Sequence, residues 1–211
     1  MVVTLGVVGI IVQTHLYNIN NTKKIHVACI GDSITEAPKY PNELQNRLGD
    51  GYKIGNFGIS SSTVLLDTDT PYIYQIEFLE AKDFLPDILV IMLGTNDART
   101  DNFRSIENFV TDYMILISEI QANKNNSQIF LVNPPPIFLN KLYLDGVNFS
   151  QEIIPRIEGI ADELGLPNID VYGALEGYPE YFPDGVHPNN EGAIIIATEV
   201  YNAIIRFSEI S

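Results

Sequence analysis

Five short segments of strand character, three of them mostly apolar, alternate with stretches of helical character and constrain the fold of this 211-residue chain most strongly. Such segments are typical of strands buried on both faces of a parallel sheet. The predicted strands are Lys24–Ile30, Tyr52–Phe57, Asp87–Leu93, Gln128–Val132 and Asn168–Val171. The predicted helices are Tyr40–Leu48, Tyr72–Lys82, Phe103–Ala122, Gln151–Leu164 and Asn189–Ile205. This alternation, with right-handed crossovers, predicts an α/β fold: a three-layer, flavodoxin-like α/β/α sandwich around a five-stranded parallel sheet.

Polar and glycine residues follow three of these predicted strands. Ser33 follows the first strand, Gly58 the second and Asn96 the third, while the segment Asp184–Pro188 precedes the last helix. Ligands of open α/β sheets bind at the carboxyl ends of the strands. We therefore expect these four segments to converge on one edge of the sheet.

The residue types at this edge suit nucleophilic catalysis. An aspartate three positions before a histidine can orient the imidazole, which can take the proton of a serine hydroxyl. The predicted catalytic residues are Ser33 as nucleophile, His187 as general base and acid, and Asp184 as the residue that orients His187. Attack on an ester creates an oxyanion that needs hydrogen-bond donors. The candidate donors are the N–H groups of Ser33 and Gly58 and the side-chain amide of Asn96.

Composition narrows the classes of partner and cofactor. The net charge of −15 disfavours nucleic acid and anionic membrane as partners. Cys29 is the only cysteine and lies in the first predicted strand, so no intramolecular disulfide or cysteine-based zinc site is expected. Three scattered histidines do not form a zinc site, and no glycine-rich phosphate loop follows a strand. The sequence therefore indicates neither a zinc site nor a phosphate-binding nucleotide site.

The amino-terminal residues 1–23 are expected to lie outside the catalytic domain, which we place at 24–211. Val2–Val12 is almost wholly apolar but too short to span a bilayer comfortably, and Asn18–Lys24 resembles a linker. The apolar stretch is a remnant of a signal or anchor, an additional strand, or a disordered tail. The first interpretation favours an extracytoplasmic or secreted protein, and a cytoplasmic protein remains the alternative. No integral membrane domain is expected.

The four blocks resemble those of the SGNH hydrolase superfamily, also called GDSL esterases. The matching blocks are Gly31-Asp32-Ser33, Asn56-Phe57-Gly58, Gly94-Thr95-Asn96-Asp97 and Asp184-Gly185-Val186-His187-Pro188. The resemblance runs from about Lys24 to the carboxyl terminus and implies a serine esterase without a cofactor. It places the four residues that name the superfamily on Ser33, Gly58, Asn96 and His187. One departure is the short segment Glu36–Lys39, because the corresponding loop of the relatives is usually longer and often lines the substrate site.

Within the superfamily, the chain looks similar to sialate O-acetylesterases and acetylxylan-type carbohydrate esterases. That subgroup implies removal of O-acetyl groups from a glycan. A lysophospholipase or thioesterase of the same superfamily is the leading alternative, and a non-catalytic glycan-binding module is a further one. The aromatic residues Tyr40, Tyr72 and Tyr74 are either sugar-lining or packing residues. Asp32 and Asp97 are expected to bond loop N–H groups rather than to act in catalysis.

Overall fold

A five-stranded, all-parallel sheet forms the centre of the molecule in the computed structural model, which describes residues 23–37, 39–100, 106–122 and 126–210. The strands are β1 (Ile25–Gly31), β2 (Tyr52–Gly58), β3 (Ile88–Met92), β4 (Gln128–Asn133) and β5 (Asn168–Asp170). Their spatial order is β2-β1-β3-β4-β5. This is the flavodoxin-like order, which confirms the predicted fold class. The predicted apolar segment Val2–Val12 lies outside the described residues.

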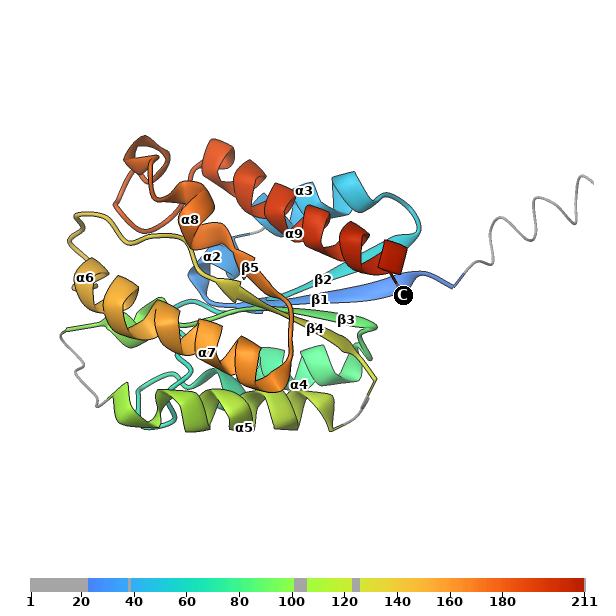
Figure 1. Ribbon diagram of the computed structural model, residues 1–211, viewed down its shortest axis with the longest axis horizontal. Coiled ribbons are helices and arrows are strands. Elements are labelled where there is room, and N and C mark those ends of the chain that lie inside the picture. The colour runs from blue at the N-terminus through green and yellow to red at the C-terminus, as the bar shows by residue number, and fades with distance from the viewer. Residues whose placement is uncertain (1–22, 38, 101–105, 123–125, 211) are drawn as a thin grey trace, which may run out of the picture.

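Helices cover both faces of the sheet (Figure 1). The first layer consists of α3 (Lys39–Leu48), α8 (Val171–Leu175) and α9 (Asn190–Ile210), and the second of α4 (Ile76–Asp83), α5 (Phe109–Gln121) and α7 (Ile154–Leu164). Four shorter helical segments lie near the carboxyl ends of the strands: α2 (Ser33–Glu36), η2 (Asn96–Ala98), α6 (Gly146–Asn148) and η4 (Phe149–Ile153). None of the helices that the structure describes is long and apolar enough to cross a membrane.

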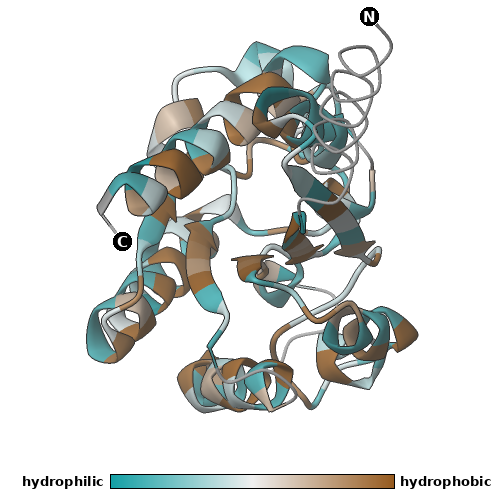
Figure 2. Cartoon of the chain, turned by 90° about the vertical axis from the view of Figure 1, so that its right-hand side faces the viewer, coloured by the Kyte–Doolittle hydropathy of each residue, from teal (hydrophilic) through white to brown (hydrophobic). Residues whose placement is uncertain are grey.

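The core divides into two apolar clusters because successive strand residues point to opposite faces of a sheet. Ala28 and Ile30 of β1 pack under α4, α5 and α7, whereas Val27 and Cys29 pack under α3, α8 and α9. Figure 2 shows the apolar sheet between the two helical layers. Cys29 is completely buried, and this burial raises the pKa of its thiol to about 12. The two clusters together fix the sheet that carries the site.

Some helix boundaries differ from the sequence-based prediction. The predicted helix Tyr72–Lys82 is a short 3₁₀ turn, η1 (Tyr72–Tyr74), followed by α4, because Gln75 between them has an extended backbone (φ −87°, ψ 158°). The predicted helix Gln151–Leu164 is the end of a longer helical run that begins with α6 at Gly146 and passes through the π-helical segment η4 into α7. The first residues of the predicted helix Phe103–Ala122 lie outside the described residues.

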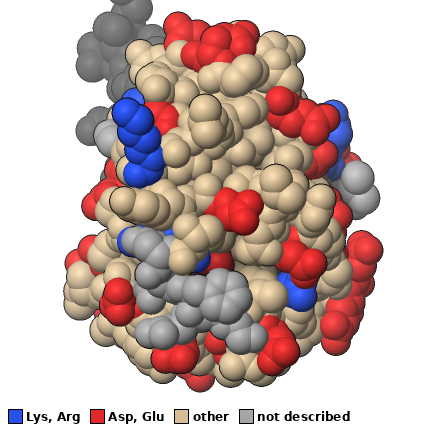
Figure 3. All heavy atoms as spheres, turned by 90° about the vertical axis from the view of Figure 1, so that its left-hand side faces the viewer, with Lys and Arg blue, Asp and Glu red and all other residues tan. Residues whose placement is uncertain are grey.

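The strand register brings the predicted blocks to one level. Gly31, at the end of β1, pairs with Gly58 of β2 on one side and with Met92 of β3 on the other. The chain segments that follow these three residues therefore leave the sheet side by side. This edge, which carries α2 and α6 in Figure 1, faces the viewer in Figure 3.

Candidate active site

Ser33 is the first residue of α2, directly after β1 and its neighbour Asp32. Asp32 caps this helix, because its Oδ1 accepts a hydrogen bond of 2.9 Å from the N–H of Ile34. The N–H groups in the first turn of a helix have no acceptor within the helix. The Ser33 N–H belongs to this set. A short helix thus presents both the hydroxyl and a backbone donor of Ser33 at the sheet edge.

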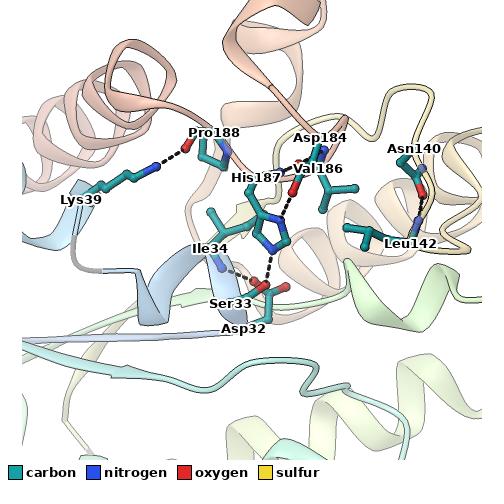
Figure 4. Close-up of polar contacts among 10 residues, drawn as sticks. All are labelled: Asp32, Ser33, Ile34, Lys39, Asn140, Leu142, Asp184, Val186, His187 and Pro188. Carbon is teal, nitrogen blue, oxygen red and sulfur yellow. Dashed lines mark hydrogen bonds and ion pairs between the residues drawn. The ribbon is translucent and has the colours of Figure 1, made fainter.

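Ser33, His187 and Asp184 form a hydrogen-bonded chain (Figure 4). The Oγ of Ser33 lies 2.8 Å from Nε2 of His187, and Nδ1 of His187 lies 2.7 Å from Oδ2 of Asp184. The side chains of His187 and Asp184 are 39% and 48% exposed, so reactants can reach this chain from solvent. The structure therefore brings together the three residues predicted to be catalytic.

The turn that carries His187 is held by Asp184 itself. Its Oδ1 accepts hydrogen bonds from the N–H groups of Val186 (2.9 Å) and His187 (2.7 Å). Partial burial raises the pKa of the Asp184 carboxyl, but the backbone and side-chain hydrogen bonds from His187 and the bond from Val186 outweigh it, so the pKa lies below its usual value. Gly185 adopts φ +85°, a conformation that favours glycine. Asp184 is thus kept ionised beside the imidazole.

Two contacts from other parts of the chain support this turn. The ammonium of Lys39 donates a 2.8 Å hydrogen bond to the carbonyl of Pro188, the residue after His187 (Figure 4). The N–H of Phe138 donates a 2.8 Å bond to the carbonyl of Gly185. Lys39 ends the short segment Glu36–Lys39, so that segment brings a contact to the histidine turn. Sequence reasoning missed both supports because they join residues distant in the chain.

Asn96 begins the 3₁₀ turn η2 after β3. Its Nδ2 donates a 3.0 Å hydrogen bond to the carbonyl of Ser62. An amide nitrogen carries two hydrogens, so this bond orients the amide and leaves one N–H for another acceptor. Asn96 and Ser33 line the same cavity. The predicted juxtaposition of these two residues is therefore present.

Gly58 ends β2 against the backbone of α2. A Cβ on this residue would collide with the backbone of Thr35 and Glu36, so glycine is required for this close approach. The Gly58 N–H donates a 3.0 Å hydrogen bond to Oδ1 of Asn56. Gly58 does not line the cavity that contains Ser33 and Asn96. Its predicted role as an oxyanion donor stays a prediction. In that role the Gly58 N–H would have to exchange its hydrogen bond to Asn56 for one to the substrate oxygen.

A cavity of about 310 Å³ opens beside the Ser33–His187 pair. Its walls combine Ser60, Ser61 and Asn96 with Arg99, Lys141 and the segment 142–144. This volume is at the lower end of the range for small-molecule sites. Sequence analysis did not single out Arg99, Lys141 or Tyr143, because nothing in their local sequence indicates that they lie near Ser33. Of the three tyrosines considered there, Tyr40 and Tyr72 are buried packing residues and Tyr74 lies elsewhere on the surface.

The carboxyls of Asp32 and Asp97 lie behind the site, and both bond backbone N–H groups: Asp32 bonds Ile34 of α2, and Asp97 bonds a loop. Asp97 accepts hydrogen bonds from the N–H groups of Val64 and Leu65, at 3.0 and 2.9 Å. Burial raises the pKa of Asp97 to about 7, and burial likewise raises the pKa of Asp32 to about 6. Within the described ranges, no group of three or more His, Cys, Asp or Glu side chains could hold a metal ion.

Residues 29–194 match the GDSL-like lipase/acylhydrolase family, and the chain belongs to that family. It is also 33% identical, over 206 residues, to an acetylxylan esterase of Xylanibacter ruminicola. That alignment covers 85% of this chain and 43% of the relative, so the chain spans less than half the length of this relative. These matches confirm the resemblance to the SGNH (GDSL) hydrolases that the four sequence blocks indicated.

Solved structures with the same fold include several esterases. Est24, a carbohydrate acetylesterase from Sinorhizobium meliloti, is 21% identical with a TM-score of 0.71, over 87% of this chain and all of that one. The aryl esterase of M. smegmatis is 18% identical with a TM-score of 0.71, over 86% of this chain and 99% of its own. A lipase/acylhydrolase from Enterococcus faecalis is 23% identical with a TM-score of 0.70, over 85% and 95% of the two chains. At these identities the comparison establishes the fold.

Proposed function

We propose that this protein is a serine esterase that removes O-acetyl groups from carbohydrates. The observation that carries the proposal is the hydrogen-bonded chain Ser33–His187–Asp184, with successive distances of 2.8 and 2.7 Å. A serine hydroxyl in contact with an imidazole that is itself held by a carboxylate is the arrangement that activates serine as a nucleophile. Membership of the acylhydrolase family supports the same chemistry.

The reaction has two halves. In the first, Nε2 of His187 takes the proton of Ser33 while Oγ bonds to the ester carbonyl carbon. The bond between that carbon and the sugar oxygen then breaks, and His187 gives the proton to the leaving alcohol. In the second, His187 takes a proton from water, whose oxygen attacks the acetyl-serine. Acetate leaves, and Oγ of Ser33 regains a proton from His187. Asp184 stabilises the imidazolium in both halves.

The negative charge that develops on the carbonyl oxygen needs preorganised donors. We assign this role to the Ser33 N–H in the first turn of α2, to the second N–H of the Asn96 amide, and to the Gly58 N–H. The 3.0 Å bond from Asn96 to the Ser62 carbonyl supports a fixed orientation of the amide. The Gly58 N–H donates to Asn56, so its participation requires a small rearrangement of that side chain.

The acetylated-carbohydrate substrate is supported by the relatives and by the size of the cavity. The acetylxylan esterase and the carbohydrate acetylesterase named above carry these activities in their names. A cavity of about 310 Å³ suits a small acyl group and one sugar better than an extended lipid.

Acetate release from a panel of acetylated glycans, alongside a series of 4-nitrophenyl esters from acetate to octanoate, tests this proposal. We expect acetate release from at least one glycan and a kcat/KM that falls as the acyl chain lengthens. If an extended apolar acyl groove existed, each buried CH₂ would contribute about 0.8 kcal/mol and kcat/KM would rise instead. A rise along the series would move the assignment to a lysophospholipase or thioesterase. Absence of hydrolysis with every ester would favour a non-catalytic glycan-binding module.

A further inference from the structure

A second hollow adjoins the cavity beside Ser33. It is an open groove of about 940 Å³, lined mainly by residues 137–147. Three residues line both hollows: Lys141, Tyr143 and Leu144. The groove and the Ser33 cavity are therefore separated only by a shared wall. A molecule whose ester reaches Ser33 can extend over this wall into the groove.

Tyr143 stands on this wall in an unusual conformation. It is 67% exposed, and its backbone φ is +60°, in the left-handed region where residues other than glycine, asparagine and aspartate are uncommon. An exposed ring gains little from packing that could offset this strain. Strained residues of this kind cluster at functional sites. The combination indicates that Tyr143 is held for contact with a ligand rather than for packing.

The segment that carries Tyr143 is preorganised by hydrogen bonds. The Tyr143 carbonyl accepts bonds from the N–H and the hydroxyl of Thr100, at 2.8 and 3.1 Å. The side chain of Asn140 cross-links the loop. Its amide nitrogen donates to the carbonyls of Phe138 and Leu144, each at 2.9 Å. Its amide oxygen accepts from the N–H of Leu142 at 2.9 Å. Figure 4 shows the Asn140–Leu142 contact beside the histidine turn. A ligand bound here would thus pay little for ordering the loop.

We propose that this groove is a subsite for the glycan chain that carries the ester, with the sugar next to the acetylated one resting on the ring of Tyr143 and within reach of Lys141. The inference rests on the proposed function and adds a determinant of substrate size to it. A sugar has an apolar face and a polar rim, which suits an aromatic ring flanked by an ammonium. Lys141 is a cation on a chain with a net charge of −15, and Figure 3 shows more acidic than basic side chains on this face of the molecule.

The open shape of the groove, and the polar side chains that interrupt its largely apolar lining, favour a glycan over a long acyl chain. Polar side chains interrupt it, including those of Asp145 and Ser150, and burying them under a hydrocarbon chain would be unfavourable. Leu139 at its margin is 99% exposed, so it does not enclose a ligand. An acyl chain needs an enclosed apolar channel, whereas a sugar chain binds in an open groove.

The test compares three substrates: 4-nitrophenyl acetate, an acetylated monosaccharide and an acetylated oligosaccharide that the parent protein hydrolyses. Tyr143→Asn tolerates the left-handed backbone, Tyr143→Phe keeps the ring, and Tyr74→Asn removes an equally exposed tyrosine outside both hollows. We expect Tyr143→Asn to lower kcat/KM about fivefold to tenfold more for the oligosaccharide than for 4-nitrophenyl acetate, the size of one lost aromatic contact. Tyr74→Asn should match the parent on all three substrates, and Tyr143→Phe should keep the parent's ratio of kcat/KM for the oligosaccharide to kcat/KM for 4-nitrophenyl acetate.

Further measurements keep the inference separable from the proposed function. The affinity of Ser33→Ala for the acetylated oligosaccharide, measured by calorimetry, should fall when Tyr143→Asn is added, and the melting temperature should not. Equal losses on all three substrates, or a lower melting temperature of Tyr143→Asn, would overturn the subsite while leaving the esterase assignment intact. So would a loss confined to 4-nitrophenyl octanoate, assayed as a fourth substrate. If the parent hydrolysed no ester, the esterase assignment would fail and the subsite with it.

Discussion

Ser33 and His187 are 154 positions apart in the chain, yet the Ser33 Oγ lies 2.8 Å from Nε2 of His187. Each residue is positioned by a different local structure. Ser33 begins the helix that Asp32 caps after strand β1, and His187 lies in a turn that Asp184 closes through two backbone N–H groups. Because the capped helix and the turn do not depend on each other, a substitution that disturbs one should leave the other formed.

Replacing Asp184 by Asn should lower kcat by about two to four orders of magnitude. The amide can still accept from the backbone N–H groups, but it loses the charge that stabilises the imidazolium and fixes the tautomer. Asp170→Asn is a matched control, because Asp170 accepts a hydrogen bond from the N–H of Gly173 in the same way at the start of α8. Steady-state kinetics on 4-nitrophenyl acetate should show the loss for Asp184→Asn only. Equal kcat values for the two variants would remove Asp184 from the mechanism.

Replacing Asn96 by Ala should lower kcat by about two to three orders of magnitude, the usual effect of removing one oxyanion donor. The KM should change little, because the contact strengthens only in the transition state. Asn168→Ala provides the control, since its amide donates to Asn133 at 3.2 Å on the edge strand β5. A raised KM with an unchanged kcat would reassign Asn96 to substrate binding.

Asp97→Asn should change how stability depends on pH. The pKa of Asp97 is raised to about 7 in the folded protein, above the ordinary value of 3.8 that the unfolded chain would have. The folded state therefore binds more protons than the unfolded state between these values, and the stability of the parent declines as pH rises from about 4 to 7. The variant lacks this contribution and can still accept the Leu65 N–H. Its melting temperature relative to the parent should thus increase from pH 4 to pH 7. A constant difference across that range would contradict this account.

A chain that begins at Lys23 should fold and retain the activity of the full chain. The described structure begins there, and the N–H of Ile25 at the start of β1 already bonds the carbonyl of Gly51 at 2.9 Å. Thermal unfolding and ester hydrolysis of the shortened and full chains provide the measurement. Aggregation, or loss of the cooperative transition, would show that the segment Val2–Val12 belongs to the core.

The strands and their order could be predicted because the signals are local. Apolar runs such as Gln128–Val132 end at recognisable breaks, and the alternation with helices leaves few topologies. The predicted site followed from the same logic, since the carboxyl ends of neighbouring parallel strands meet. The four-residue helix α2 was not predicted, because a single turn has no periodicity to detect.

Contacts made across the fold could not be predicted from the sequence. The hydrogen bond from Lys39 to the Pro188 carbonyl joins residues 149 positions apart. The N–H of Gly58 donates to Asn56, which depends on a side-chain rotamer that the sequence does not specify. The left-handed backbone of Tyr143 has no glycine or asparagine to indicate it. Nothing in the sequence of the segment 137–147 therefore indicated that it lines the groove beside Ser33.

The most direct test of the account is the kcat/KM of Ser33→Ala toward 4-nitrophenyl acetate, measured on protein whose melting temperature matches that of the parent. Ser208→Ala serves as the control, because its hydroxyl bonds the Ile204 carbonyl in α9, outside both hollows. We predict that Ser33→Ala loses nearly all turnover, since no acyl-enzyme can form, and that Ser208→Ala retains it. Residual activity of Ser33→Ala within about tenfold of the parent, a barrier change of only about 1.4 kcal/mol, would show that another group is the nucleophile.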